Sequence, residues 1–236
     1  GLSDHEIIEP FIEHQGERRL FWLRRPRAVG SRLLVARAGA AVTESRRRGR
    51  VVVLLDPESA FGTGGHGTTE GCLLALEERV AGGESVLDVG SGTGILAVAA
   101  RKLGAGSVTA VDIDARACRA TRRNLALNGV EDRVEVIEAG VESVQGRFGI
   151  VLANLRTPIL LNVMDGVVGR VAEGGVLILS GILERELHPF LAFLEKFSLT
   201  MLKTLRICGW MTLVFAGGPG LISEGRGRDS LHSGLP

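Results

Sequence analysis

Three glycines at alternate positions follow a short apolar run that carries a single acidic residue. Residues 86–94 read V-L-D-V-G-S-G-T-G, and an apolar segment at 95–103 comes directly after them. The run predicts a buried strand, the glycines a tight turn, and the following segment a helix. Glycines allow backbone N–H groups and the start of the helix to approach a ligand closely. We therefore expect a cofactor-binding turn at Gly90, Gly92 and Gly94.

The spacing and the charge of this turn distinguish between cofactors. The dinucleotide fingerprint G-x-G-x-x-G requires a glycine at its sixth position, where this chain has Ile95. Asp88, two residues before the first glycine, would repel a pyrophosphate but attract a cation. S-adenosyl-L-methionine carries a sulfonium and an ammonium, so we expect it as the cofactor, with Asp88 among its contacts. A dinucleotide site and a purely structural turn are the alternatives.

Polar residues also stand where the next two strands should end. In an open α/β sheet, ligands bind at the carboxyl ends of the strands. Asp112 closes one strand, where a carboxylate can accept hydrogen bonds from both ribose hydroxyls. Asp114 is expected to cap the following helix, which is also the alternative interpretation of Asp112. Ile113 and, one strand further on, Glu138 and Ala139 are expected to contact the nucleoside.

Asn154 stands at the tip of another apolar strand and is the predicted catalytic residue, adjoining the cofactor. Its side-chain oxygen can accept a hydrogen bond from one N–H of an attacking amine and so orient it, while neighbouring backbone carbonyls accept a hydrogen bond from the other N–H. Methyl transfer from a sulfonium needs mainly in-line positioning and a neutral nucleophile, and desolvation favours the neutral form of a lysine amine. The alternative is that Asn154 only caps the next helix.

Two further segments are candidates for the site. Residues 61–69 contain four glycines in nine residues, which predicts a mobile loop able to close over a cofactor. His66 in this loop is either a base or a residue that orders the loop. The segment 180–183 either lines the far side of the pocket or is an ordinary turn between a strand and a helix.

These residues require a regular alternation of strands and helices to position them. Further strands are predicted at 107–112, 134–138, 149–153 and 176–180, and helices at 115–128, 158–171 and 184–197. Two final strands, 199–205 and 210–216, should pair as a hairpin. The alternation implies right-handed crossovers in a parallel sheet. We expect an α/β fold with a doubly wound, mostly parallel, seven-stranded Rossmann-like sheet and one antiparallel strand.

The chain divides into three expected parts. Residues 1–55 form a small basic N-terminal extension with a helix within 2–14, strands at 20–23, 33–36 and 51–55, and a hairpin. Residues 56–216 form the S-adenosylmethionine-dependent methyltransferase domain, which begins with a helix at 68–80 whose N-cap is Thr68. Residues 217–236 are rich in Gly, Ser and Arg and are expected to be a flexible tail.

The composition limits the partners and the location. The net charge is only +1, but residues 18–50 hold eleven arginines and one acid. One interpretation is that RNA or another acidic partner binds to this segment. The other is that the chain simply uses Arg in preference to Lys throughout. Few aromatic residues are present to stack on bases, which counts against RNA binding. The three cysteines are far apart, which predicts neither a metal site nor a disulfide framework. Without a signal-peptide pattern or an apolar run of membrane-spanning length, we expect a cytoplasmic protein with no membrane partner.

Residues 56–216 resemble the ribosomal protein methyltransferases that trimethylate large-subunit ribosomal protein eleven. The motifs that carry the resemblance are D-P-x-x-A-F-G-T-G-x-H-x-T-T at 56–69, L-D-V-G-S-G-T-G-I-L-A at 87–97, V-D-I-D at 111–114, A-N-L at 153–155, L-S-G-I-L at 179–183 and W-x-x-L at 210–213. The resemblance implies the class I methyltransferase fold and methylation of an amine nitrogen of a protein, a lysine or an N-terminal amine, with a ribosomal protein as a possible substrate.

The same resemblance implies roles for particular residues. Phe61, Thr63, Thr68 and Thr69 would belong to a loop that closes over the cofactor. Gly90 and Asp112 would contact S-adenosylmethionine, and Asn154 would lie at the methyl-transfer centre. The N-terminal substrate-recognition region is shorter here than in the family, and Gly67 and Arg156 replace residues that are commonly bulkier or uncharged. A small-molecule amine or RNA as acceptor, or a module that binds the cofactor without catalysis, therefore remains an alternative.

Overall fold

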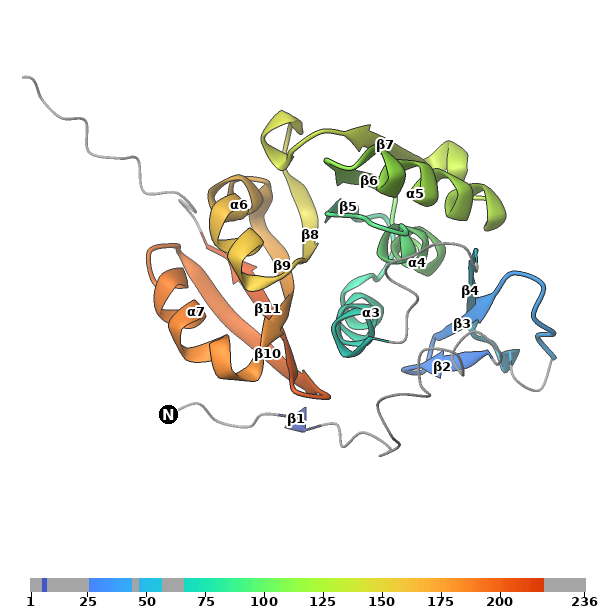
Figure 1. Ribbon diagram of the computed structural model, residues 1–236, viewed down its shortest axis with the longest axis horizontal. Coiled ribbons are helices and arrows are strands. Elements are labelled where there is room, and N and C mark those ends of the chain that lie inside the picture. Colours follow the sequence, from blue (N-terminus) through green and yellow to red (C-terminus); the bar gives the residue numbers. More distant parts are fainter. Residues whose placement is uncertain (1–5, 8–25, 44–46, 57–65, 219–236) are drawn as a thin grey trace, which may run out of the picture.

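The computed structural model describes residues 6–7, 26–43, 47–56 and 66–218, and its main element is an eight-stranded sheet flanked by helices (Figure 1). The strand order is β1-β10-β11-β9-β8-β5-β6-β7. The strands of this sheet are β1 (Glu6–Ile7), β5 (Ser85–Val89), β6 (Ser107–Asp112), β7 (Val134–Glu138), β8 (Phe148–Asn154), β9 (Val171–Leu183), β10 (Leu199–Ile207) and β11 (Trp210–Gly217). The helices are α3 (Gly67–Arg79), α4 (Ile95–Leu103), α5 (Ala115–Leu127), α6 (Thr157–Gly169) and α7 (Leu187–Leu194).

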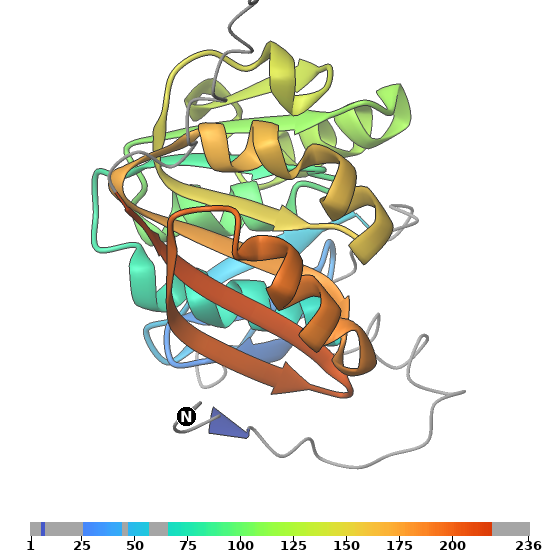
Figure 2. The same ribbon diagram turned by 90° about the vertical axis from the view of Figure 1, so that its left-hand side faces the viewer.

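The chain builds this sheet outward from its middle. From β5 it adds β6 and β7 on one side and then crosses back to place β8 and β9 on the other, so the order reverses between β5 and β8. All these strands are parallel, whereas β11 is antiparallel to both β9 and β10. Figure 2 shows the β10–β11 hairpin, which continues the sheet beyond β9. The predicted α/β fold with one antiparallel strand is confirmed, but β1 adds an eighth strand to the seven that were expected. The reversal creates the crevice where such sheets bind ligands.

Three sequence predictions differ from the structure. Glu6 and Ile7 form β1, parallel to β10, so the helix expected within 2–14 is wrong for these two residues; the strand expected at 20–23 lies outside the described part. Strand β9 is longer than predicted because it pairs with β8 from Val171 and with β11 as far as Leu183. The helix expected from residue 184 begins as a 3₁₀ turn, Glu184–Glu186, before α7.

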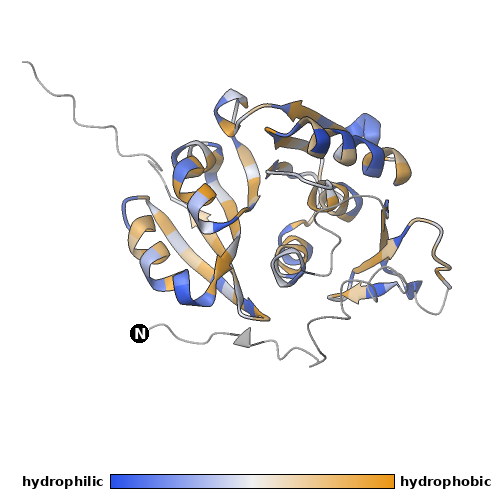
Figure 3. Cartoon of the chain, viewed as in Figure 1, coloured by the Kyte–Doolittle hydropathy of each residue, from blue (hydrophilic) through white to orange (hydrophobic). Residues whose placement is uncertain are grey.

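Alternating side chains divide the core of the sheet into two layers. On one face Val86, Ile150 and Ile178 pack with α3 and α4, and on the other Leu87 and Val151 pack with α6 and α7. Figure 3 shows the matching pattern, with apolar strands and helices that carry one apolar and one polar side. Strands that are covered on both faces have continuous apolar sequences, which explains why their positions could be predicted from the sequence.

A second sheet of three strands lies beside α4 (Figure 1). Its strands are β2 (Arg27–Val29), β3 (Leu33–Arg37) and β4 (Val51–Leu55). Strands β2 and β3 form an antiparallel hairpin, to which β4 adds in parallel; β3 and β4 were expected, whereas β2 was not. Arg32 donates to the carbonyls of Glu77 and Val80, at the end of α3, and Leu103, at the end of α4. Cations are favourable at helix C-termini, so this arginine of the basic segment ties the small sheet to the main domain.

Candidate functional site

The glycine turn lies between β5 and α4 and is tied to the end of β6. The N–H of Gly90 donates to the Val111 carbonyl at 2.8 Å, and the N–H of Gly92 donates to Asp112 Oδ2 at 3.0 Å. Gly94 adopts a left-handed conformation at the N-cap of α4. The predicted sequence of strand, turn and helix is therefore confirmed, with the open end of the helix directed at the turn.

The Asp112 carboxylate is half-buried at the end of β6, and backbone N–H groups fix its orientation. Besides Gly92 on Oδ2, Asp114 N donates to Oδ1 at 3.0 Å. Each carboxylate oxygen has a further lone pair, so the group can still accept hydrogen bonds from a ligand. Asp114 caps α5 by accepting from Arg116 N at 2.8 Å, as predicted. Between the two acids, Ile113 is 82% exposed, which leaves an apolar side chain beside the carboxylate.

The end of β7 lies next to Asp112. Glu138 is the partner of Asp112 in the β6–β7 pairing and is exposed, and Ala139 N donates to the Asp112 carbonyl at 3.1 Å. The structure thus brings these two predicted residues to the same edge of the sheet as the acid.

Asp88 lies underneath the glycine turn and only 1% of it is exposed. Burial raises the pKa of this carboxyl to about 7; a hydrogen bond from the Ala97 backbone opposes that shift, and the charge of Asp112 adds to it. Asp88 Oδ2 has no hydrogen-bond partner in the described structure. A buried carboxylate oxygen without a partner is unfavourable, so a cation in the turn above would stabilise the ionised form of Asp88.

Asn154 is the last residue of β8 and is half-buried, on the opposite side of β5 from Asp112. It does not cap the next helix, because α6 begins after Arg156, its N-cap residue. Leu155 N donates to the Ser180 carbonyl at 3.1 Å, which turns the chain toward β9 directly after Asn154. The capping interpretation of Asn154 is therefore excluded, and its amide is left for another role.

The start of α3 supplies the remaining residues of the described site. Helix α3 begins at Gly67 with His66 as its N-cap, so the prediction that Thr68 is the N-cap is wrong; Thr68 lies inside the first turn and is buried, like Thr69. His66 Nδ1 is 2.9 Å from Thr68 Oγ1, and its ring lies 4.8 Å from that of Trp210. His66 thus helps to order the start of the helix. Phe61 and Thr63 lie outside the described residues.

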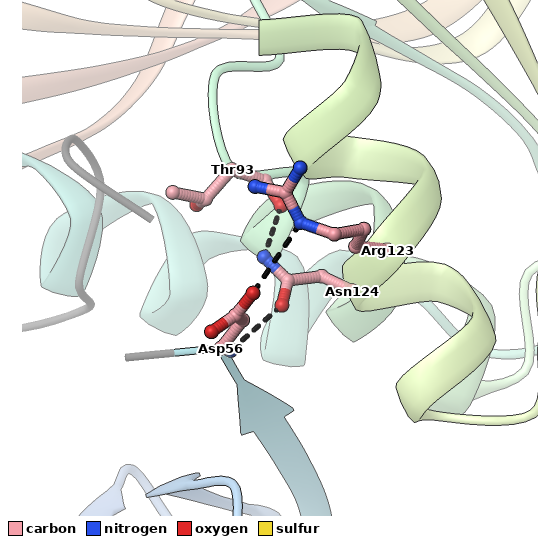
Figure 4. Close-up of polar contacts among 4 residues, drawn as sticks. All are labelled: Asp56, Thr93, Arg123 and Asn124. Carbon is pink, nitrogen blue, oxygen red and sulfur yellow. Dashed lines mark hydrogen bonds and ion pairs between the residues drawn. The ribbon is translucent and has the colours of Figure 1, made fainter. Parts of the chain in front are cut away.

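One residue that holds the site together was not found from the sequence. Asn124 on α5 is fully buried, accepts from Asp56 N at 2.8 Å and donates to the Thr93 carbonyl at 2.8 Å (Figure 4). Asp56 also pairs with Arg123 at 3.3 Å. Asn124 therefore joins the end of β4 to the glycine turn. A polar residue on the buried side of an amphipathic helix was the only sequence signal.

Two other expectations concern absences. Within residues 6–7, 26–43, 47–56 and 66–218, no group of three or more His, Cys, Asp and Glu side chains is arranged to hold a metal ion. None of the helices described is both long and apolar enough to cross a membrane.

Comparison with known proteins shows what this arrangement resembles. The ribosomal protein L11 methyltransferase of Citrifermentans bemidjiense is 41% identical over 198 residues, covering 81% of this chain and 63% of that protein. That of Trichlorobacter lovleyi is 44% identical over 173 residues, covering 69% and 55%. The chain spans about half the length of several of the curated relatives that it matches.

Solved structures agree with this relationship. The crystal structure of a ribosomal protein L11 methylase from Lactobacillus delbrueckii subsp. bulgaricus is 30% identical, with a TM-score of 0.73 over 82% of this chain and 98% of that chain. A methyltransferase from Pyrococcus furiosus, at 21% identity and a TM-score of 0.51, shares the fold alone. The sheet is thus that of class I methyltransferases. Residues 21–217 match the model of the family described as ribosomal protein L11 methyltransferase (PrmA), and the chain belongs to this family.

Proposed function

We propose that this chain is an S-adenosylmethionine-dependent methyltransferase that acts on an amine nitrogen of a protein, with ribosomal protein L11 as the acceptor. The observation that carries the proposal is the placement of Asp112 and Asn154 at the ends of β6 and β8, on either side of the glycine turn that follows β5. The relatives are named for methylation of ribosomal protein L11, which supports this choice of acceptor.

The residues present fit S-adenosylmethionine. Asp112 keeps acceptor capacity for the ribose hydroxyls, with its orientation already fixed by two backbone N–H groups. Ile113 offers an exposed apolar surface suited to a base. Asp88 has a buried, unpaired oxygen whose ionised form favours a nearby cation. Charge, hydrogen bonding and apolar surface thus match three different parts of one ligand.

In the proposed mechanism the chain supplies positioning. The bound cofactor would supply an activated methyl group on a sulfonium, so strong acid–base catalysis is not required. Asn154 accepts a hydrogen bond from the acceptor amine through its side-chain oxygen and aims the nitrogen lone pair at the methyl group. The attacking amine must be neutral, and burial beside the apolar core lowers the pKa of an amine and so favours the neutral form. Orientation of this kind can supply several powers of ten in rate.

Transfer of radioactive methyl from S-adenosylmethionine to purified ribosomal protein L11 tests the proposal. We expect Asn154→Ala to bind S-adenosylhomocysteine like the wild type but to lose turnover, and Asp112→Ala to lose most cofactor affinity. Asn128→Ala, at the far end of α5, is the matched control for a lost amide. A wild-type chain that binds neither S-adenosylmethionine nor S-adenosylhomocysteine at millimolar concentration contradicts the proposal. If the chain binds the cofactor but does not transfer the labelled methyl group to L11, the choice of L11 as acceptor is wrong. The same assay with a cell lysate in place of L11 then identifies another acceptor.

A further inference from the structure

Strand β9 carries a β-bulge at Gly181, close to the proposed methyl-transfer centre. In the pairing of β9 with β11, Ser180 lies opposite Thr212 and Ile182 opposite Met211, so Gly181 is the extra residue. Its φ of +88° lies in the left-handed region that favours glycine. Bulges redirect the backbone of a strand and are frequent beside active sites.

The backbone of Leu155 occupies the space that a side chain at Gly181 would need. A Cβ atom at residue 181 would lie 2.5 Å from the Leu155 carbonyl carbon and 3.1 Å from its nitrogen. In the same place Leu155 N donates to the Ser180 carbonyl, and Asn154 is the partner of Ser180 in the β8–β9 pairing. The missing side chain therefore allows the segment after β8 to lie directly against β9.

The other side of Leu155 faces the glycine turn. A Cβ atom at Gly90 would lie 3.2 Å from Leu155 Cγ, so the leucine side chain fills the space above that glycine. Leu155 is thus held between Gly181 of β9 and Gly90 of the turn. Since Leu155 directly follows Asn154, the two contacts together restrict where the Asn154 amide can lie.

The bulge itself is held by buried hydrogen bonds. Ser180 Oγ lies 3.0 Å from the Met211 carbonyl and 2.8 Å from Thr212 Oγ1, and both Ser180 and Thr212 are buried. A β-carbon at Gly71 of α3 would in turn lie 2.9 Å from Thr212 Cβ. The bulge therefore cannot easily shift toward β11 or α3 to accommodate a larger residue, and the displacement falls on Leu155.

We propose that Gly181 is a positioning residue for methyl transfer, because its bulge fixes the backbone of Leu155 and with it the Asn154 amide. This inference rests on the proposed role of Asn154. In Gly181→Ala the Leu155 backbone must move by about 1 Å, since carbon atoms in contact lie about 3.5 to 4.0 Å apart. A displacement of about 1 Å in a reacting group can reduce a rate about 100-fold.

The test compares Gly181→Ala with Gly174→Ala, using ribosomal protein L11 as acceptor. Gly174 lies in the same strand with a φ of +68°, but nothing lies within 4 Å of its Cβ position, so this control also places an alanine at a positive φ but without the clash. We expect kcat to fall about 100-fold in Gly181→Ala, with at most a few-fold change in the Kd for S-adenosylhomocysteine, and to stay near wild type in Gly174→Ala. Equal kcat values in the two variants would overturn the proposal.

Amide hydrogen exchange provides a second measurement that needs no substrate. Exchange at the Leu155 amide should be faster in Gly181→Ala than in Gly174→Ala when both are compared at equal unfolding free energy, because its bond to the Ser180 carbonyl is strained. Unchanged exchange at Leu155 contradicts the inference even if turnover falls. A wild type without turnover contradicts the proposed function, while the exchange result still decides whether the bulge holds Leu155.

Discussion

Replacing Asp88 by asparagine should remove a specific pH dependence from the stability of the cofactor-free protein. Burial raises the pKa of this carboxyl from an ordinary 3.8 to about 7, and it interacts electrostatically with Asp112 on β6 and with the buried Cys72 thiol on α3. Because the folded protein binds the proton more tightly than the unfolded chain, this group's contribution to stability is full below pH 3.8. It is lost as the pH rises toward 7 and is constant above that.

The size of the effect follows from the same shift. One pKa step corresponds to about 1.4 kcal/mol, so the ionised carboxylate costs the folded state about 4 kcal/mol relative to the neutral form. About 2.5 kcal/mol of this loss falls between pH 5 and pH 8. An asparagine keeps the acceptor for the Ala97 N–H but cannot ionise. The unfolding free energy of Asp88→Asn should therefore fall less steeply over this range than that of the wild type.

Urea unfolding at pH 5, 6, 7 and 8, at constant ionic strength and without cofactor, measures the difference. Asp165→Asn is the control, because the Asp165 side chain is 74% exposed and its ion pair with Lys196 spans 3.4 Å. This control should follow the wild-type curve to within about 0.5 kcal/mol. Parallel curves for Asp88→Asn and wild type would show that Asp88 is not the buried, unpaired acid described above, and the reasoning would be refuted.

Three further predictions concern the cofactor and the core. Affinity for S-adenosylmethionine relative to the uncharged-sulfur S-adenosylhomocysteine, measured by calorimetry, should rise from pH 6 to pH 8 in the wild type but stay constant in Asp88→Asn. Asn124→Ala should lose about 1 to 3 kcal/mol of unfolding free energy, since it removes the hydrogen bonds of a fully buried amide with Asp56 N and the Thr93 carbonyl, and should also lose cofactor affinity. Asn128→Ala, which does not reach the glycine turn, should keep that affinity. Leu152→Ala should lose about 2 to 5 kcal/mol in urea unfolding, whereas Leu202→Ala, 44% exposed, should change by at most about 0.5 kcal/mol.

Local patterns predicted most of the parallel sheet. The strands that end at Asp112 and Asn154 are apolar runs followed by polar residues, and their positions agree with the structure within one or two residues. The glycine turn was equally readable, because its conformation depends on the glycines themselves. Both signals are contained within a few consecutive residues, and so need no knowledge of distant contacts.

Features that depend on contacts between distant parts of the chain could not be predicted from the sequence. The bulge at Gly181 exists because of the register with β11, about thirty residues later. From the sequence, the same segment was expected either to line the pocket or to be an ordinary turn. The bridging role of Asn124 depends on Asp56 and Thr93, which the fold brings together from different elements. Thr68 looked like an N-cap because of its residue type, but the helix begins one residue before it. A single sequence shows which residues are polar but not which distant atoms they meet.

The position of β11 has a consequence for how the chain reaches its folded form. Along the chain β11 follows β10, yet it lies between β9 and β10 and pairs with both. During synthesis on the ribosome, β5 to β9 can assemble as they emerge, but β9 keeps an unpaired apolar edge until β11 follows. Such edges recruit other strands, and incomplete chains that expose them are prone to aggregate. The nascent chain is therefore most vulnerable after β9 has emerged and before the β10–β11 hairpin covers the edge of β9.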